Sequence, residues 1–252
     1  DTPGAVEIFA MPEKDRSGKI PNTRYIIGHD PVDNDAAESS SLTSTFVLDL
    51  WTDTIVAEYT GRHSMANENY EIVRMLCLFY NAKCLYESNK KGLYAYFAQM
   101  NSTHLLADTP EYLRDKQLIK YSRMGSNQKG VNASAAINNY ANGLIRDWLL
   151  KPVNIITKND EGEEIEATVP NLYRIRNRAL LEELIAFNPE INVDRVRALG
   201  MVMLYREEKM ILYQGKPSSE SDKVPKDYLG NDPFFQSFER RNSKFSKELS
   251  RW

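Results

Sequence analysis

The chain has 252 residues, of which 42% are hydrophobic and 27% are charged, a composition typical of globular proteins. Its 32 lysines and arginines nearly balance 35 aspartates and glutamates, which leaves a net charge of −3. Overall basicity therefore does not indicate nucleic-acid binding, and any site for a polyanion must be a local patch. The apolar runs are too short to span a membrane, so we expect no membrane partner.

The order of polar and apolar segments predicts three parts. These are an N-terminal strand and linker over residues 1–23, a main domain over 24–213 and a polar tail over 214–252. The two cysteines, Cys77 and Cys84, lack the spacing of a metal site, so we expect both to be reduced core residues inside a cell. The first residues do not have the pattern of a signal peptide, so we expect no secretion.

The first half of the chain alternates between strand and helix patterns. In chain order the predicted elements are strands over Val6–Ala10, Tyr25–Asp30, Thr45–Trp51 and Ile55–Tyr59, a helix from Asn67 to Tyr80, a strand over Cys84–Glu87, a helix over Gly92–Met100 and an edge strand over His104–Ala107. The three strands from Tyr25 to Tyr59 form an antiparallel meander. A right-handed crossover helix then returns the chain parallel to the first of them.

The second half is predicted to be mostly helical, with one interruption. Residues 108–131 show no regular pattern, and a helix follows over Ala133–Leu150. A β-hairpin is predicted over about 153–169, because two strand patterns flank a turn sequence. Helices over Leu172–Phe187 and Val193–Tyr213 come last, separated by Pro189.

Carboxylates close two of the predicted strands. Asp30 ends the first strand of the meander and Glu87 ends the strand expected to lie parallel to it, so both reach the edge where open α/β sheets bind ligands. This strand order describes an α/β, ribonuclease H-like mixed five-stranded sheet flanked by helices, with the β-hairpin added. A third acid usually arrives there from a later helix, and Asp194, in the first turn of the last core helix, is the candidate. Clustered acids bind hard divalent cations, and two such ions can drive phosphodiester hydrolysis.

Each acid also has a purely structural interpretation. Asp194 could simply stabilise the positive end of its helix. Glu87 could be neutralised by Lys90 or Lys91, and Asp30, before Pro31, could start a turn.

Three sequence motifs resemble the nuclease domain of the large terminase subunit, the DNA-packaging protein of tailed double-stranded DNA bacteriophages. They are YIIGHDP at residues 25–31, YNAKCLYESNKKG at 80–92 and NVDRVRAL at 192–199. The resemblance implies that Asp30, Glu87 and Asp194 are catalytic residues that hold two Mg²⁺ or Mn²⁺ ions. The third motif departs from the family pattern, because Val193 and Arg197 stand where acids are common. Asp33, Asp35 or a water molecule could then supply the missing ligand.

The resemblance further implies an endonuclease that cuts concatemeric double-stranded viral DNA when genome packaging begins and ends. Such a domain works in the cytoplasm of the infected bacterial host, together with the ATPase domain of the same subunit, the small terminase subunit and the portal protein. The residues expected to bind DNA are Lys90, Lys91, Lys120, Arg123 and Lys129. Two alternatives stay open: another ribonuclease H-fold nuclease of resolvase or transposase type, and a non-catalytic module that docks on DNA or the portal. The hairpin either contacts DNA or decorates the surface.

Overall fold

The structure is a computed structural model that describes residues 4–33, 41–119, 128–158, 162–187 and 193–214. Several expectations fall outside these ranges: the DNA-binding roles of Lys120 and Arg123, the compensating role of Asp35 and the nature of the tail beyond residue 214. In the part that is described, no helix combines the length and the apolar character that crossing a membrane requires.

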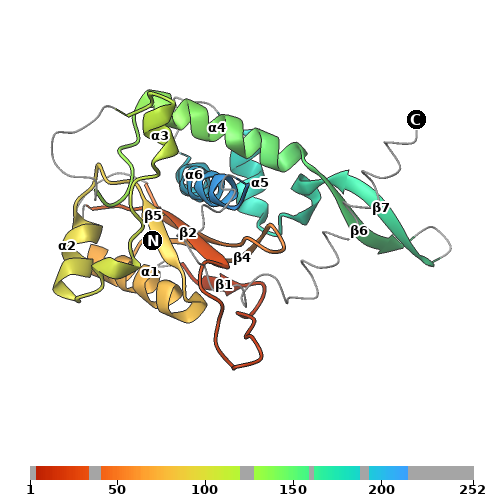
Figure 1. Cartoon of the computed structure of the whole chain (residues 1–252), viewed down its shortest axis with the longest axis horizontal. Coiled ribbons are helices and arrows are strands. Elements are labelled where there is room, and N and C mark those ends of the chain that lie inside the picture. The colour runs from red at the N-terminus through yellow and green to blue at the C-terminus, as the bar shows by residue number, and fades with distance from the viewer. Residues whose placement is uncertain (1–3, 34–40, 120–127, 159–161, 188–192, 215–252) are drawn as a thin grey trace, which may run out of the picture. The chain divides into compact units, whose positions relative to one another are not determined.

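A five-stranded mixed sheet lies at the centre of the fold (Figure 1). Its strands are β1 (Val6–Ile8), β2 (Tyr25–Asp30), β3 (Thr43–Asp49), β4 (Thr54–Gly61) and β5 (Lys83–Tyr86), in the spatial order β1-β4-β3-β2-β5. The meander β2-β3-β4 is antiparallel, and β5 runs parallel to β2 with His29 opposite Tyr86. The α/β, ribonuclease H-like fold class is thereby confirmed, including the neighbouring positions of the two strands that lead to Asp30 and Glu87.

Helices cover both faces of the sheet. On one face, α1 (Ala66–Tyr80) and α2 (Gly92–Gln99) bury apolar side chains in a core shared with β2, β4 and β5. On the other face, α6 (Asp194–Gln214) packs against the sheet, and α4 (Ala135–Leu150) adds its apolar stripe to the same core (Figure 1). Because both faces are covered, all six residues of β2 are buried, as expected for the central strand of a layered α/β protein.

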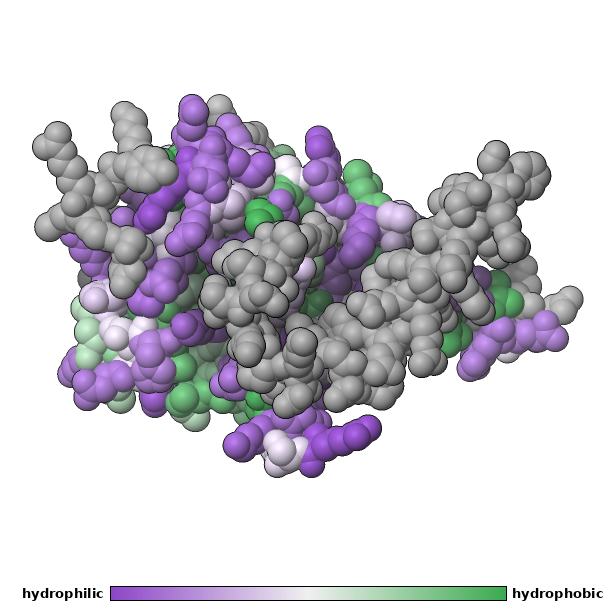
Figure 2. Space-filling model, in the orientation of Figure 1, coloured by the Kyte–Doolittle hydropathy of each residue, from purple (hydrophilic) through white to green (hydrophobic). Residues whose placement is uncertain are grey.

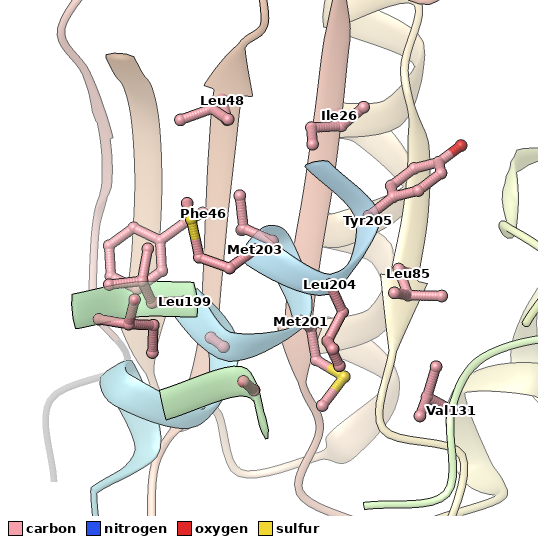
Figure 3. Close-up of a cluster of buried hydrophobic side chains, with 14 of the residues drawn as sticks. Ile26, Phe46, Leu48, Leu85, Val131, Leu199, Met201, Met203, Leu204 and Tyr205 are labelled. Carbon is pink, nitrogen blue, oxygen red and sulfur yellow. The ribbon is translucent and has the colours of Figure 1, made fainter. Parts of the chain in front are cut away.

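Close packing of α6 on β2 depends on Gly28. A Cβ atom at this position would lie under 3.0 Å from backbone atoms of Ala198 and Val202 in α6. The helix therefore lies almost directly on the strand. Around this contact, Ile26, Phe46 and Leu48 of the sheet face Leu199 and Met203 of α6 (Figure 3). This packing fixes where the first turn of α6 stands relative to Asp30.

The remaining elements are short or lie outside the central sheet. They are η1 (Thr103–Leu105), α3 (Tyr112–Asp115), β6 (Pro152–Lys158), β7 (Glu164–Pro170), η2 (Asn171–Arg174) and α5 (Arg178–Ile185). The predicted hairpin is present, and β6 and β7 form a separate two-stranded sheet in the described part of the chain. Exposed Ile156 and Ile165 lie on it. In the view of Figure 2, hydrophobic residues are otherwise interspersed among a mainly hydrophilic described surface.

Three local predictions were wrong. Residues 104–107 do not form the fifth strand: Thr103–Leu105 is a 3₁₀ turn, and Leu106 makes only an isolated parallel bridge to Cys84. The fifth strand is β1, which pairs with β4 at the opposite edge. The helix predicted from Leu172 begins only at Arg178, because the Asn177 side chain accepts a hydrogen bond from the Leu180 amide and caps it there. The short helix α3 interrupts a segment predicted to be irregular.

Candidate metal centre

Asp30 and Glu87 lie at the same edge of the sheet. Glu87 follows the last paired residue of β5, and its backbone amide donates to the His29 carbonyl at 3.2 Å, which extends the parallel pairing to the level of Asp30. Side chains alternate along a strand. Asp30 therefore shares the α6 face with Gly28, and Glu87 shares it with Leu85, whose side chain packs in the α6 core. The two acids occupy neighbouring positions on one face.

Asp194 is brought to this edge by α6. Ala198 and Val202 lie over Gly28, and Tyr205 lies further along the helix near Ile26 (Figure 3), so the helix starts at the Asp30 end of β2. The Asp194 carboxylate accepts a hydrogen bond from the Leu42 amide at 2.7 Å, next to the start of β3. The sheet and its covering helix thus carry three acids from distant parts of the sequence to one end of the molecule.

Among the described residues, Lys90 forms an ion pair with Asp30. Its Nζ lies 3.2 Å from Asp30 Oδ1 and also donates to the carbonyl oxygen of Pro31. Of the two lysines considered as a structural partner of Glu87, Lys90 pairs with Asp30 instead, because the turn after β5 directs its ammonium across to β2. Glu87 instead accepts a hydrogen bond from the Asn89 side chain at 3.0 Å.

The electrostatic environment of Asp30 reflects its burial and the other acids. Its side chain is 5% exposed, and this burial raises the pKa of the carboxyl group above its ordinary value. The Lys90 ammonium opposes that rise, while the negative charges of Glu87 and Asp194 add to it. Both acids therefore act on Asp30 electrostatically, as expected of carboxylates that surround one site.

The chemistry of these donors fits a hard divalent cation. A carboxylate oxygen of Asp30 and the Pro31 carbonyl already hold a cationic group, the Lys90 ammonium, and carboxylate and carbonyl oxygens are the ligands of Mg²⁺ and Mn²⁺. Within the described ranges, however, no three acidic, histidine or cysteine side chains stand close enough together to hold one ion. Binding would thus require the acids to draw together and Lys90 to withdraw.

Two neighbouring residues make other contacts. Asp33, expected as a possible substitute for the missing acid, accepts hydrogen bonds from the Tyr70 hydroxyl at 2.7 Å and from the Gly92 amide at 3.0 Å, which ties the loop after β2 to α1 and α2. His29 points to the opposite face of the sheet from Asp30, and its Nδ1 lies 2.9 Å from the Thr45 hydroxyl. Burial lowers the pKa of His29 to about 3, so the ring is neutral.

Sequence reasoning missed Glu58, a buried acid on the same face. It lies in β4 opposite Phe46, is only 3% exposed, and its Oε2 has no hydrogen-bond partner among the described residues. Burial and the charge of Glu7 raise the pKa of Glu58 to about 7, although Arg195 opposes the rise. Glu58 follows the short apolar run Ile55–Ala57 in β4, and no sequence signal distinguishes it from an acid on an exposed strand face.

Replacing Glu58 with Gln should increase stability at alkaline pH. Because its pKa is raised from 4.5 to about 7 on folding, the wild type loses stability as the pH rises through this interval, and the full loss is on the order of 3 kcal/mol. Glu58→Gln cannot ionise and should avoid this loss. Urea unfolding at pH 5 and pH 8.5 should show little difference between the proteins at pH 5 and a more stable variant at pH 8.5. Equal differences at both pH values would contradict the assignment.

Basic residues line a hollow beside Glu87. It has a volume of about 310 Å³ and is lined by Tyr86, Ser88, Lys90, Lys91, Tyr94, Gln128 and Lys129. Lys129 is partly committed, since its Nζ lies 2.8 Å from Asp108 and donates to the Leu106 carbonyl. The described members of the predicted DNA-binding set, Lys90, Lys91 and Lys129, therefore gather on one side of the acidic edge. Their role towards DNA stays a prediction.

No family model and no curated protein sequence matches the chain. The solved structures similar to it include large terminase nucleases of several phages, the family that the sequence motifs resemble. That of thermophilic phage G20c with bound zinc shares 14% identity over 70% of this chain and 78% of its own, with a TM-score of 0.43. The nuclease domain of Thermus phage P74-26 shares 16% identity over 77% and 88%, with a TM-score of 0.33. A K428A mutant nuclease domain of gp2 from bacterial virus Sf6, with manganese and beta-thujaplicinol, shares 11% over 73% and 88%, with a TM-score of 0.30.

Proposed function

We propose that this chain is a divalent-metal-dependent endonuclease that cuts double-stranded DNA during the packaging of a phage genome. The observation that carries the proposal is the position of three acids at one edge of a ribonuclease H-like sheet: Asp30 at the end of β2, Glu87 directly after β5 and Asp194 in the first turn of α6. Each of these acids also lies in one of the three sequence motifs that resemble large terminase nucleases.

In this proposal Asp30, Glu87 and Asp194 hold two Mg²⁺ or Mn²⁺ ions. Bound there, the ions would supply activation of water and neutralisation of charge on the phosphodiester. The carboxylates orient the ions, and the contact between α6 and Gly28 keeps Asp194 at the same level as Asp30. Lys91 and Lys129, beside Glu87, attract the DNA backbone. Because contacts to phosphate carry no base information, we expect low sequence preference.

The biological setting is part of the same proposal. The ATPase domain of the same subunit, the small terminase subunit and the portal protein would be the partners, in the cytoplasm of an infected bacterial host. The substrate would be concatemeric viral DNA, cut when packaging starts and when it ends.

Substrate comparison tests the proposed reaction. With Mn²⁺ present, the protein should cut linear and supercoiled duplex DNA, and it should cut four-way junctions and RNA/DNA hybrids no faster than plain duplex. A strong preference for junctions would favour a resolvase, and a preference for hybrids would favour a ribonuclease. Absence of cleavage on every substrate would reject the endonuclease proposal.

Two observations favour a second candidate, a non-catalytic module that docks on DNA or the portal. No three described acids are close enough together to hold an ion, and Val193 occupies a position where an acid is common in the resembled motif. Calorimetry separates the two candidates. Heat from DNA binding without any heat from Mn²⁺ binding would support the docking module, whereas Mn²⁺ binding supports the nuclease.

A further inference from the structure

The acidic edge contains a cation that belongs to the protein itself. The Lys90 ammonium contacts the carboxylate of Asp30 at 3.2 Å and the carbonyl of Pro31. Asp30 is almost fully buried, with a side chain 5% exposed, whereas Lys90 remains 37% exposed. A buried carboxylate needs such a counter-charge. The lysine supplies it from a loop, three residues after Glu87, rather than from a rigid element.

The carboxylate oxygens of Asp30 would be ligands of a metal ion in the function proposed above. An ammonium and a divalent cation cannot both occupy them, because like charges at contact distance repel strongly.

The Lys90 ammonium has a second possible position, in the hollow beside Glu87. Its side chain lines the hollow of about 310 Å³ that Lys91 and Lys129 share. A change of rotamer could therefore carry the ammonium from Asp30 into this hollow without moving β2 or β5. In the hollow the ammonium would lie beside Lys91 and Lys129, where it could bind a phosphate group.

We propose that Lys90 is an internal counter-ion that neutralises Asp30 in the metal-free protein and must be displaced before a divalent ion binds. Lys90 is thus a positioning residue that holds the acidic edge together and lowers its affinity for metal. This inference rests on the proposed metal site. It predicts that removal of the ammonium strengthens metal binding, opposite to the weakening expected if Lys90 helped to hold the ion through an ordered ligand shell.

Calorimetric titration with Mn²⁺, without DNA, tests the inference on the full chain. Lys90→Met, which keeps an unbranched apolar side chain but removes the charge, should bind Mn²⁺ about tenfold more tightly than the wild type. Its metal-free form should melt at a lower temperature than the wild type, and added Mn²⁺ should raise its melting temperature by more. The matched control is Lys91→Met, because Lys91 is the adjacent lysine of the same hollow and no contact joins it to Asp30 in the described structure.

Lys90→Arg keeps the positive charge but changes the shape of the side chain, so it distinguishes an effect of charge from an effect of shape. It should bind Mn²⁺ as weakly as the wild type. Equal affinities of Lys90→Met and the wild type would overturn the inference, as would equal tightening in Lys91→Met or in Lys90→Arg. If the wild type binds Mn²⁺ but Lys90→Met binds no tighter, only this inference fails. If none of the four proteins binds Mn²⁺, the proposed metal site fails as well.

Discussion

Asp30→Asn should reduce Mn²⁺-dependent DNA cleavage by about 10³-fold, because it removes a charged ligand from the proposed ions. A bound metal contributes several kcal/mol to transition-state stabilisation, and about 4 kcal/mol corresponds to this factor in rate. Asn has the same shape and neutralises a buried carboxylate, so the fold should be kept. Initial rates of plasmid nicking at saturating Mn²⁺ measure the effect, and EDTA should abolish the activity of the wild type.

The matched control is Asp147→Asn. Asp147 is 66% exposed and pairs only with its neighbour Arg146 among the described contacts, so the same change there should leave cleavage within about twofold of the wild type, as is usual for exposed ion pairs. Undiminished cleavage by Asp30→Asn would remove Asp30 from the site. An equal loss in both variants would mean that the effect is not specific to the acidic edge.

Gly28→Ala should destabilise the fold by about 3 kcal/mol or more, because overpacking in a rigid core costs 1–3 kcal/mol and sometimes more. The added Cβ would lie under 3.0 Å from backbone atoms of Ala198 and Val202, and neither backbone can turn aside as a flexible side chain could. α6 must therefore lift from β2, which also moves Asp194 away from Asp30. Urea unfolding measures the loss of stability.

Gly143→Ala in α4 is the matched control, for which we expect no loss of stability. Apart from the backbone of its own helix, no atom of the described residues lies within 4 Å of a Cβ placed at Gly143, and alanine favours the helix over glycine by up to about 1 kcal/mol. This variant should be as stable as the wild type or slightly more so. If Gly28→Ala were equally harmless, the close contact between strand and helix would not determine where α6 lies.

The order of the four strands β4-β3-β2-β5 could be predicted from sequence because each step has a strong local signal. β2 and β3 are apolar runs bounded by turns, and α1 has one clear apolar stripe. The right-handed crossover then leaves few places for β5. The short apolar run at residues 104–107 was misassigned because such runs fit both a strand and a packed turn. Only backbone pairing distinguishes a strand from a turn, and in this segment the pairing is a single bridge between Leu106 and Cys84.

The positions of the three acids follow from the sequence patterns, whereas their contacts do not, and their role as metal ligands stays a prediction. Strand ends and the resembled motifs single out Asp30, Glu87 and Asp194, whose places follow from the topology. The partner of Lys90 depends on the conformation of residues 87–91, where the turn sends the ammonium to Asp30 rather than back to Glu87. Loop side chains of this kind carry no periodic signal. Burial of Glu58 likewise depends on α6 covering β4, which no local pattern encodes.

A crystal of the chain soaked in Mn²⁺ and measured for anomalous scattering tests the central claim most directly. Manganese peaks should lie between the carboxylates of Asp30, Glu87 and Asp194, with the Lys90 ammonium withdrawn from Asp30. Peaks only elsewhere on the surface, or the three acids left apart with Lys90 still on Asp30 at saturating Mn²⁺, would contradict it.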